Sequence, residues 1–155
     1  MNIDKKLNFV ALFSIFIIFG IDRYTKIFIK KNYTENVFYI NDFLNFDLIW
    51  NTGIGFGLLN TNSEIFYNSI SLLIGLIIIL LIYIGFKSDN YDKIIFSIII
   101  GGALGNFYDR IFFKAVPDFI DLHLENFHWF TFNVADIFIS IGVLVFIIRS
   151  FFTKN

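Results

Sequence analysis

Cysteine is absent from the 155-residue chain, proline occurs once, and charged residues make up only 16%. The absence of cysteine excludes disulfides, thiolate metal sites, a cysteine nucleophile and lipidation on sulfur. The net charge of −1, from 12 basic and 13 acidic residues, indicates neither a basic surface for nucleic acid nor an acidic tail. We therefore expect no nucleic-acid partner, and charge is informative only through its position along the chain.

Apolar residues dominate what is present. They make up 57% of the chain, with 23 phenylalanines, and the mean hydropathy is +0.71. Soluble domains have about 45–50% apolar and about 25% charged residues, and a bilayer core about 30 Å thick needs roughly 20 apolar residues in a helix. The sequence therefore predicts one integral membrane domain over residues 1–155, an all-α protein with four transmembrane helices at about 7–29, 65–86, 94–113 and 132–152.

Four spans place both termini on one side of the membrane and gather the polar residues on the other. The 12 Lys and Arg residues divide evenly, six on each side, so the positive-inside rule does not decide the orientation. Because several basic residues on the loop side lie beside acids and can be paired, we expect cytoplasmic termini. The residues expected to share the opposite face are Asp22, Asn51, Asn106, Asp109, Arg110, Asp118, Asn133 and Asp136.

Alternation of apolar and polar residues predicts a small β-sheet cap between the spans. Residues 37–50, VFYINDFLNFDLIW, have the pattern of two short strands joined by an Asn-Asp turn. Segment 120–125, IDLHLE, also alternates and could add another strand. We expect a cap lying on the membrane surface, formed by about residues 37–59 and 119–131.

Ionisable side chains within or beside a span are costly, so each one predicts function or pairing. Asp22 and Lys26 are four residues apart and can pair on one helix. An ion pair that positions the end of the first span explains them at least as well as a direct role in a site. For Asp109 and Arg110, helix packing followed by an interfacial salt bridge is the preferred interpretation.

The third span also carries glycines at a spacing that matters for packing. Gly101 and Gly105 are four residues apart, and small residues at this spacing let membrane helices approach closely. Asn106 follows them and lies deeper in the span than Asp109, where an amide is suited to orient a partner group.

Asp118 and Asp136 are the strongest candidates for chemistry. Asp118 follows Pro117, so its backbone is expected to be extended or turning. Asp136 lies in the first turn of the fourth span after Asn133, an arrangement that helix capping alone would explain. Because the third span ends and the fourth begins on the same face, the two aspartates can converge with a water between them. Adjacent carboxylates share a proton, and such a pair can activate water on an amide carbonyl without a metal.

Other kinds of chemistry have weaker support. His123 and His128 lie near acids, but their aromatic neighbours fit an interfacial strand better and no HExxH helix is present, so a metal-dependent lipid enzyme that uses His123 and the acids is a weaker alternative. A proton- or ion-coupled transporter or a membrane adaptor would need polar residues through the membrane depth, and the second span has no charge. Serines within the spans have no nearby histidine, which argues against serine catalysis by Ser14, Ser69, Ser71 or Ser97.

The motifs of this chain resemble those of the lipoprotein signal peptidases, also called signal peptidase II, over nearly the whole chain. They are DRYTK at 22–26, NTGIGFG at 51–57, GGALGNFYDR at 101–110, VPDF at 116–119 and FNVAD at 132–136. By motif position, the resemblance implies that Asp118 and Asp136 are the catalytic pair. The residues that it implies support the site and the substrate are Asp22, Lys26, Asn51, Gly53, Gly101, Gly102, Gly105, Asn106, Arg110 and Asn133.

This resemblance implies a bacterial inner-membrane aspartic endopeptidase with four spans and an extracytoplasmic cap. Members of the family remove signal peptides from prolipoproteins, cutting on the N-terminal side of a cysteine that carries diacylglycerol. The resemblance also implies cytoplasmic termini, an active site at the outer leaflet, prolipoprotein and membrane lipid as partners, a monomer, and no metal or other cofactor. The chain departs from the family at Gly55, where Ala is usual, and before Phe132, where a Pro is often found. Neither departure touches the aspartates.

Overall fold

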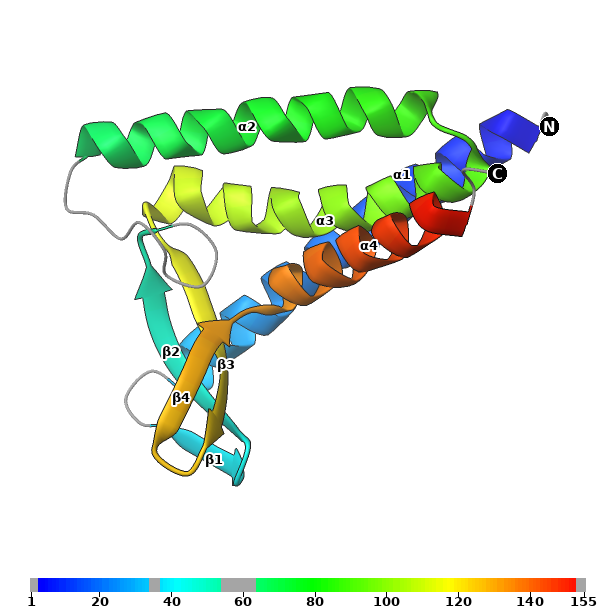
Figure 1. Cartoon of the computed structure of the whole chain (residues 1–155). Helices are drawn as coiled ribbons and strands as arrows, with labels where there is room; N and C mark the ends of the chain where they lie inside the picture. The colour runs from blue at the N-terminus through cyan, green and yellow to red at the C-terminus, as the bar shows by residue number, and fades with distance from the viewer. Residues whose placement is uncertain (1–2, 34–36, 54–63, 153–155) are drawn as a thin grey trace.

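The computed structural model describes residues 3–33, 37–53 and 64–152, which form long helices and one small sheet (Figure 1). The helices are α1 (Ile3–Asn32), α2 (Glu64–Lys87), α3 (Asn90–Phe113) and α4 (Val134–Phe152). The strands are β1 (Phe38–Asn41), β2 (Leu44–Asn51), β3 (Val116–Leu124) and β4 (Phe127–Phe132).

All four helices are long and apolar enough to cross a bilayer, so the chain is a multi-pass membrane protein. The side chains that stay exposed along them are mostly large and apolar, such as Phe16, Leu72 and Leu144, as expected where lipid replaces water. The four spans predicted from hydropathy are therefore confirmed.

Helix α3 lies at the centre of the bundle, and α1, α2 and α4 all pack against it (Figure 1). At two of these contacts, glycines allow the helices to approach closely. A Cβ added at Gly101 would lie 2.9 Å from Cβ of Ile18 on α1, and one added at Gly102 would lie 2.6 Å from the carbonyl oxygen of Ala135 on α4. The close helix approach predicted from the small-residue spacing is thus present, on two sides of α3.

Local signals explain where the helices begin and end. Helix α3 starts at Asn90, earlier than the predicted residue 94, because the Asp89 carboxylate caps it by accepting hydrogen bonds from the backbone of Tyr91 and Asp92. It ends where Lys114 adopts the left-handed conformation, with φ of 57°. Helix α4 begins at Val134 instead of the predicted residue 132, because the residues before Asn133 belong to β4.

The four strands form one antiparallel sheet in the order β1-β2-β3-β4. The β1-β2 hairpin was predicted, although its turn lies one residue later than expected, since Asn41 ends β1 and its Oδ1 accepts a hydrogen bond from the backbone of Phe43. The strand predicted at 120–125 is present as the second half of β3, and β4, which pairs with it, was not predicted. Positions 54–59 of the predicted cap lie outside the described residues.

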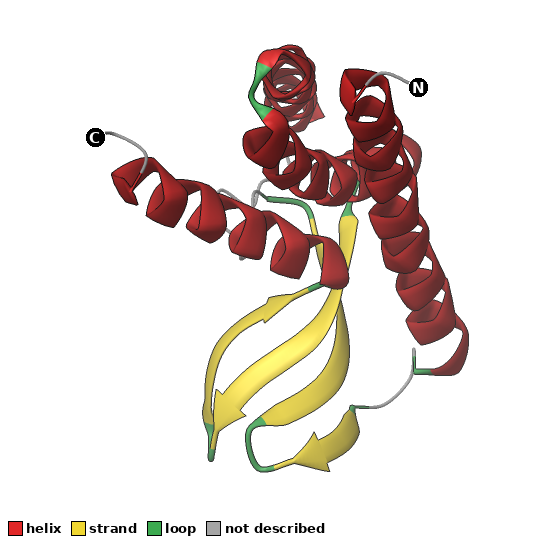
Figure 2. Ribbon diagram, turned by 90° about the vertical axis from the view of Figure 1, so that its right-hand side faces the viewer, coloured by secondary structure: helices red, strands yellow, loops and turns green. Residues whose placement is uncertain are grey.

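The sheet is attached directly to the helices. Only Lys114 and Ala115 separate α3 from β3, and only Asn133 separates β4 from α4. Figure 2 shows the sheet extending from this end of the bundle, with the last turns of α1 beside it. The start of α1 and the end of α4 lie together at the other end (Figure 1). The junction of sheet and helices is where the predicted polar residues meet.

Candidate active site

Asp118 and Asp136 line the same cavity at the junction of sheet and helices. Asp118 is the third residue of β3, and Asp136 lies in the first turn of α4. The cavity has a volume of about 240 Å³, and its walls come from α2, α3, α4, β2 and β3. Its lining residues are Asn51, Ile74, Ala103, Asn106, Arg110, Val116, Asp118, Asn133, Asp136, Ile139 and Ser140.

The Asp118 carboxylate is buried and held by two amides. Asn51 Nδ2 donates to its Oδ2 at 2.8 Å, and Asn133 Nδ2 donates to its Oδ1 at 2.6 Å. Burial first, and then the nearby carboxyl of Asp136, raise the pKa of Asp118 to about 6, although the two amide donors act in the opposite direction. The protonated form of Asp118 is therefore accessible at a pH where an exposed aspartate would be fully ionised.

The Asp136 carboxylate is fixed by the start of its own helix and by α3. The backbone N–H of Asn133 donates to Asp136 Oδ2 at 3.1 Å, and the Asp136 N–H returns a hydrogen bond of 3.1 Å to Asn133 Oδ1. Asn106 Nδ2 donates to Asp136 Oδ1 at 2.8 Å. The capping role predicted for Asn133 is present, and Asn133 also contacts both aspartates, which links the start of α4 to β3.

A buried network of charges lies behind Asn106. Lys26 Nζ lies 2.7 Å from Asn106 Oδ1, 2.8 Å from Asp109 Oδ2 and 3.0 Å from Asp22 Oδ1. The predicted pairing of Asp22 with Lys26 is confirmed. Arg23 completes the network with hydrogen bonds to Asp22 and Asp109. Two cations and two anions therefore meet between α1 and α3, and Asn106 connects them to Asp136.

The prediction of an interfacial salt bridge for Asp109 and Arg110 is wrong. Asp109 is fully buried and pairs with Arg23 and Lys26 of α1, because close helix packing brings those side chains to it. Arg110 is also buried, and among the described residues no hydrogen-bond partner reaches its Nη1. The Arg110 side chain instead forms part of the cavity wall, where an unused N–H donor is available to a bound group.

The remaining predicted residues lie around this arrangement without lining the cavity. The Gly53 N–H donates to Asn51 Oδ1 at 2.8 Å and so orients the amide that contacts Asp118. Asp22 Oδ1 accepts a hydrogen bond of 3.2 Å from the Ala135 N–H at the start of α4. The three glycines on α3 lie at its contacts with α1 and α4. Gly55 lies outside the described residues.

Several residues of this site were missed by reasoning from the sequence. Arg23 was overlooked, although it adjoins Asp22 within the same motif, and its position beside an acid in an apolar span was the available signal. Ser140 lines the cavity without any such signal. His123 and His128 do not line the cavity.

The arrangement of the two carboxylates is compatible with proton transfer in this cavity. Each oxygen of the two carboxylates accepts an N–H hydrogen bond, which fixes the groups and leaves their remaining lone pairs for water or substrate. A buried pair that shares one proton can act as base and acid on the same reacting group. The two carboxyl groups therefore line one cavity with lone pairs available to a water or a substrate.

Comparison with known proteins places this geometry in context. Residues 14–152 match the sequence model of the family described as signal peptidase (SPase) II. The lipoprotein signal peptidase of Pelagibacter ubique is 51% identical over 157 residues, covering 99% of this chain and 95% of that protein. The lipoprotein signal peptidase of Francisella tularensis subsp. mediasiatica is 39% identical over 145 residues, covering 90% and 89%. A bacterial membrane enzyme solved by the in meso method superposes with a TM-score of 0.77 at 28% identity, covering 94% of this chain and 90% of that one.

Proposed function

The chain belongs to the signal peptidase II family and is therefore a peptidase, and we propose that Asp118 and Asp136 are its catalytic pair. The observation that carries this proposal is the double contact of Asn133, which donates to both carboxylates across one cavity. The chain then acts as an aspartic-type endopeptidase. It needs neither a covalent nucleophile nor a metal for the cleavage step.

In the proposed reaction, Asp118 is the protonated partner and Asp136 is the ionised one. Asp136 takes a proton from the water as the water oxygen attacks the scissile carbonyl carbon. Asp118 gives its proton to the carbonyl oxygen, which forms a neutral tetrahedral intermediate. The intermediate then collapses as the C–N bond breaks and the amine leaves with the proton held by Asp136, while Asp118 recovers a proton from the hydroxyl. The raised pKa of Asp118 supports its assignment as the acid.

The neighbouring polar residues orient this pair and the substrate. Asn51 and Asn133 hold Asp118, while Asn106 holds Asp136 and is itself held by Lys26. Arg110 offers its unused N–H to a substrate carbonyl, where it would stabilise negative charge that develops during attack. The network around Asp22 and the α3 glycines fix the helices that carry these groups.

The substrate that fits this proposal is a diacylglyceryl-modified prolipoprotein, cut on the N-terminal side of its lipidated cysteine. Both relatives named above are lipoprotein signal peptidases. The cavity is lined by polar side chains from both the sheet and the helices, and by Ile74, Ala103 and Ile139 from three different helices. Such a mixed lining suits a substrate that combines a polar peptide with a lipid, because the lipid can stay beside the apolar helices while the peptide contacts the polar groups.

We further place the protein in the bacterial inner membrane, as a monomer with both termini cytoplasmic and the sheet at the outer leaflet. The sheet lies at the end of the bundle opposite the start of α1 and the end of α4, as this orientation requires (Figure 1). A lipidated substrate would then reach the cavity by lateral diffusion in the bilayer.

The proposal is tested by a cleavage assay with purified protein and a lipidated prolipoprotein. Asp118→Asn and Asp136→Asn should each reduce the cleavage rate by at least about 10²–10⁴-fold while the protein stays folded. Asp47→Asn, which changes a carboxylate of β2 outside the cavity, is the matched control and should cleave normally.

Two further arms of the assay separate the other classes of protein. The unlipidated substrate should be cut much more slowly than the lipidated one, and EDTA should leave cleavage unchanged. Inhibition by EDTA would favour a metal-dependent lipid enzyme instead, and normal turnover in either aspartate variant would disprove the catalytic pair.

A further inference from the structure

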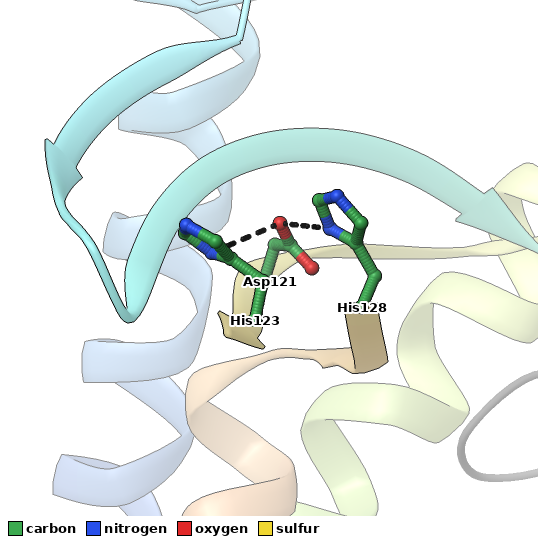
Figure 3. A group of neighbouring side chains, drawn as sticks. All are labelled: Asp121, His123 and His128. Atoms are coloured by element: carbon green, nitrogen blue, oxygen red, sulfur yellow. Dashed lines mark hydrogen bonds and ion pairs between the residues drawn. The ribbon is translucent and has the colours of Figure 1, made fainter. Parts of the chain in front are cut away.

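A second group of chemically capable side chains lies on the sheet, outside the cavity. Asp121, His123 and His128 converge so that one ligand atom from each lies within 4.8 Å of the others (Figure 3). His128 Nδ1 lies 2.8 Å from Asp121 Oδ2, and His123 Nδ1 lies 3.6 Å from the same oxygen. The two imidazole rings are stacked at 5.3 Å between centroids, on either side of the carboxylate in Figure 3.

The sheet places these three side chains together through an irregularity between β3 and β4. Asp121 and His123 are two residues apart on β3 and therefore share one face of the sheet. Leu122 pairs with Phe130, but His123 pairs with His128, so Trp129 is the extra residue of a bulge. The bulge shifts the alternation of β4 and turns His128 to the face of Asp121.

Buried polar atoms at this cluster lack partners. The His123 side chain is only 8% exposed, and among the described residues no hydrogen-bond partner reaches its Nδ1, which faces Asp121. Asn45 of β2 lies opposite Asp121 in the sheet, and its buried Oδ1 also has no donor within the described part of the chain. Two buried polar atoms without a hydrogen bond lie beside a buried carboxylate, and a bound cation would satisfy the nitrogen of His123, since leaving such groups unsatisfied is costly.

We propose that Asp121 Oδ2, His123 Nδ1 and His128 Nδ1 bind a divalent transition-metal ion of the zinc type. Two imidazoles and one carboxylate match the donor set of Zn²⁺, whereas Mg²⁺ and Ca²⁺ require oxygen ligands throughout. Ligand atoms around a tetrahedral Zn²⁺ lie about 3.3 Å apart. The two separations from Asp121 Oδ2, 2.8 and 3.6 Å, bracket that value, and all three ligand atoms lie within 4.8 Å of one another.

A fourth ligand, such as a water, would complete the coordination of the bound ion. The His128 side chain is 57% exposed, so the ion reaches the site from outside the sheet without passing through the cavity. The sequence argued against a metal because two histidines alone are a weak signal. The structure adds the buried Asp121 between them.

The role assigned to this ion is structural. It joins β3 to β4 next to the turn of their hairpin, and β3 also carries Asp118 while β4 leads directly to Asn133. A metal clamp on this hairpin would stiffen the segment that holds the proposed catalytic pair. It takes no part in the cleavage step, so this inference and the proposed function can fail independently.

Metal binding can be tested on the full chain in detergent, purified with an affinity tag that contains no histidine. The chain has two histidines and no cysteine, so metal binding through imidazole can only come from this cluster. Co²⁺ should bind at one ion per chain, give the visible absorption of a tetrahedral site, and be displaced by Zn²⁺. Zn²⁺ at 100 times its Kd should raise the unfolding midpoint by at least about 3 °C.

His128→Gln is the decisive variant because this exposed side chain can be replaced without disturbing the fold. It should weaken Co²⁺ binding by at least about tenfold, and Asp121→Asn should do the same. Glu125→Gln, an exposed acid in the same hairpin turn, is the matched control and should bind like the unmodified chain. Absence of the tetrahedral absorption, or equal affinity in His128→Gln, would overturn the proposal and leave a hydrogen-bonded Asp-His cluster only.

Discussion

Gly105 of α3 lies directly against the carboxylate of Asp22 on α1, and a Cβ added at this glycine would meet Oδ2 and lie 2.9 Å from Cγ. Asp22 has no room to retreat, because its Oδ1 is also bonded to Lys26 and to the Ala135 N–H of α4. The missing side chain at Gly105 is thus what allows three helices to meet at one carboxylate.

Gly105→Ala should destabilise the protein by about 1–3 kcal/mol, because the added methyl group overpacks this contact. The measurement is thermal unfolding of the purified protein in detergent. Gly20→Ala is the matched control, since no atom lies within 4 Å of a Cβ built there and alanine favours the helix. Equal stability of the two variants would show that the Gly105 contact can relax at no cost.

The titration of Asp118 should make the stability of the protein depend on pH. Its folded pKa of about 6 lies above the unfolded value, so the folded state binds the extra proton between these two values. The resulting stability, about 3 kcal/mol at most, is fully present below about pH 4 and is lost as the pH rises through about 6. Asp118→Asn should remove this loss, so its unfolding midpoint should change less between about pH 5 and pH 8 than that of the unmodified protein.

Asn51 should influence the pH dependence of the reaction as well as its rate. Its amide donates to Asp118 and opposes the rise in the pKa of that carboxyl. Asn51→Ala should therefore move the alkaline limb of kcat/KM to higher pH, and loss of the positioning hydrogen bond should lower its maximum about tenfold. A lower maximum with an unmoved limb would contradict the assignment of Asp118 as the acid.

Asp109→Asn should be among the most destabilising single changes, by about 3–5 kcal/mol, because it leaves two buried cations with one carboxylate between them. Lys26 is fully buried and Arg23 is only 14% exposed, so solvent cannot replace the lost partner. Asp92→Asn removes a partly exposed ion pair with Arg149 at the other end of α3 and should cost no more than about 1 kcal/mol. Similar midpoints for the two variants in a thermal unfolding series would contradict a cooperative buried network.

The four spans, and the gathering of polar residues at one end of them, could be predicted from the sequence. Hydropathy over about 20 residues depends only on local composition, so each span can be recognised by itself. The number of spans then determines which span ends lie on the same side of the membrane. The capping of α4 by Asn133 was also local and therefore predictable. Residues such as Asn51 and Asn106 could be assigned to the same face, but their individual hydrogen bonds could not be predicted.

Features that depend on packing between distant segments could not be predicted from the sequence. Arg23 and Asp109 are 86 residues apart and meet only because α1 and α3 approach closely. Strand β4, FHWFTF, is rich in aromatic residues on both faces, so it lacks the alternation that would have distinguished it from the start of a helix. The bulge at Trp129, which brings His128 to Asp121, leaves no recognisable pattern in the sequence.

The charges buried between α1 and α3 also constrain how the protein enters the membrane. Synthesis delivers α1 first, with one anion and two cations of this network, while the second anion, Asp109, belongs to a helix made later. An unpaired cation at the centre of an inserting helix costs about 2.5–3.5 kcal/mol. Asp22 contacts both Arg23 and Lys26 within α1, so one carboxylate serves two cations until Asp109 of α3 supplies the second. The charges of this network are therefore balanced only when α3 has inserted beside α1 during biogenesis.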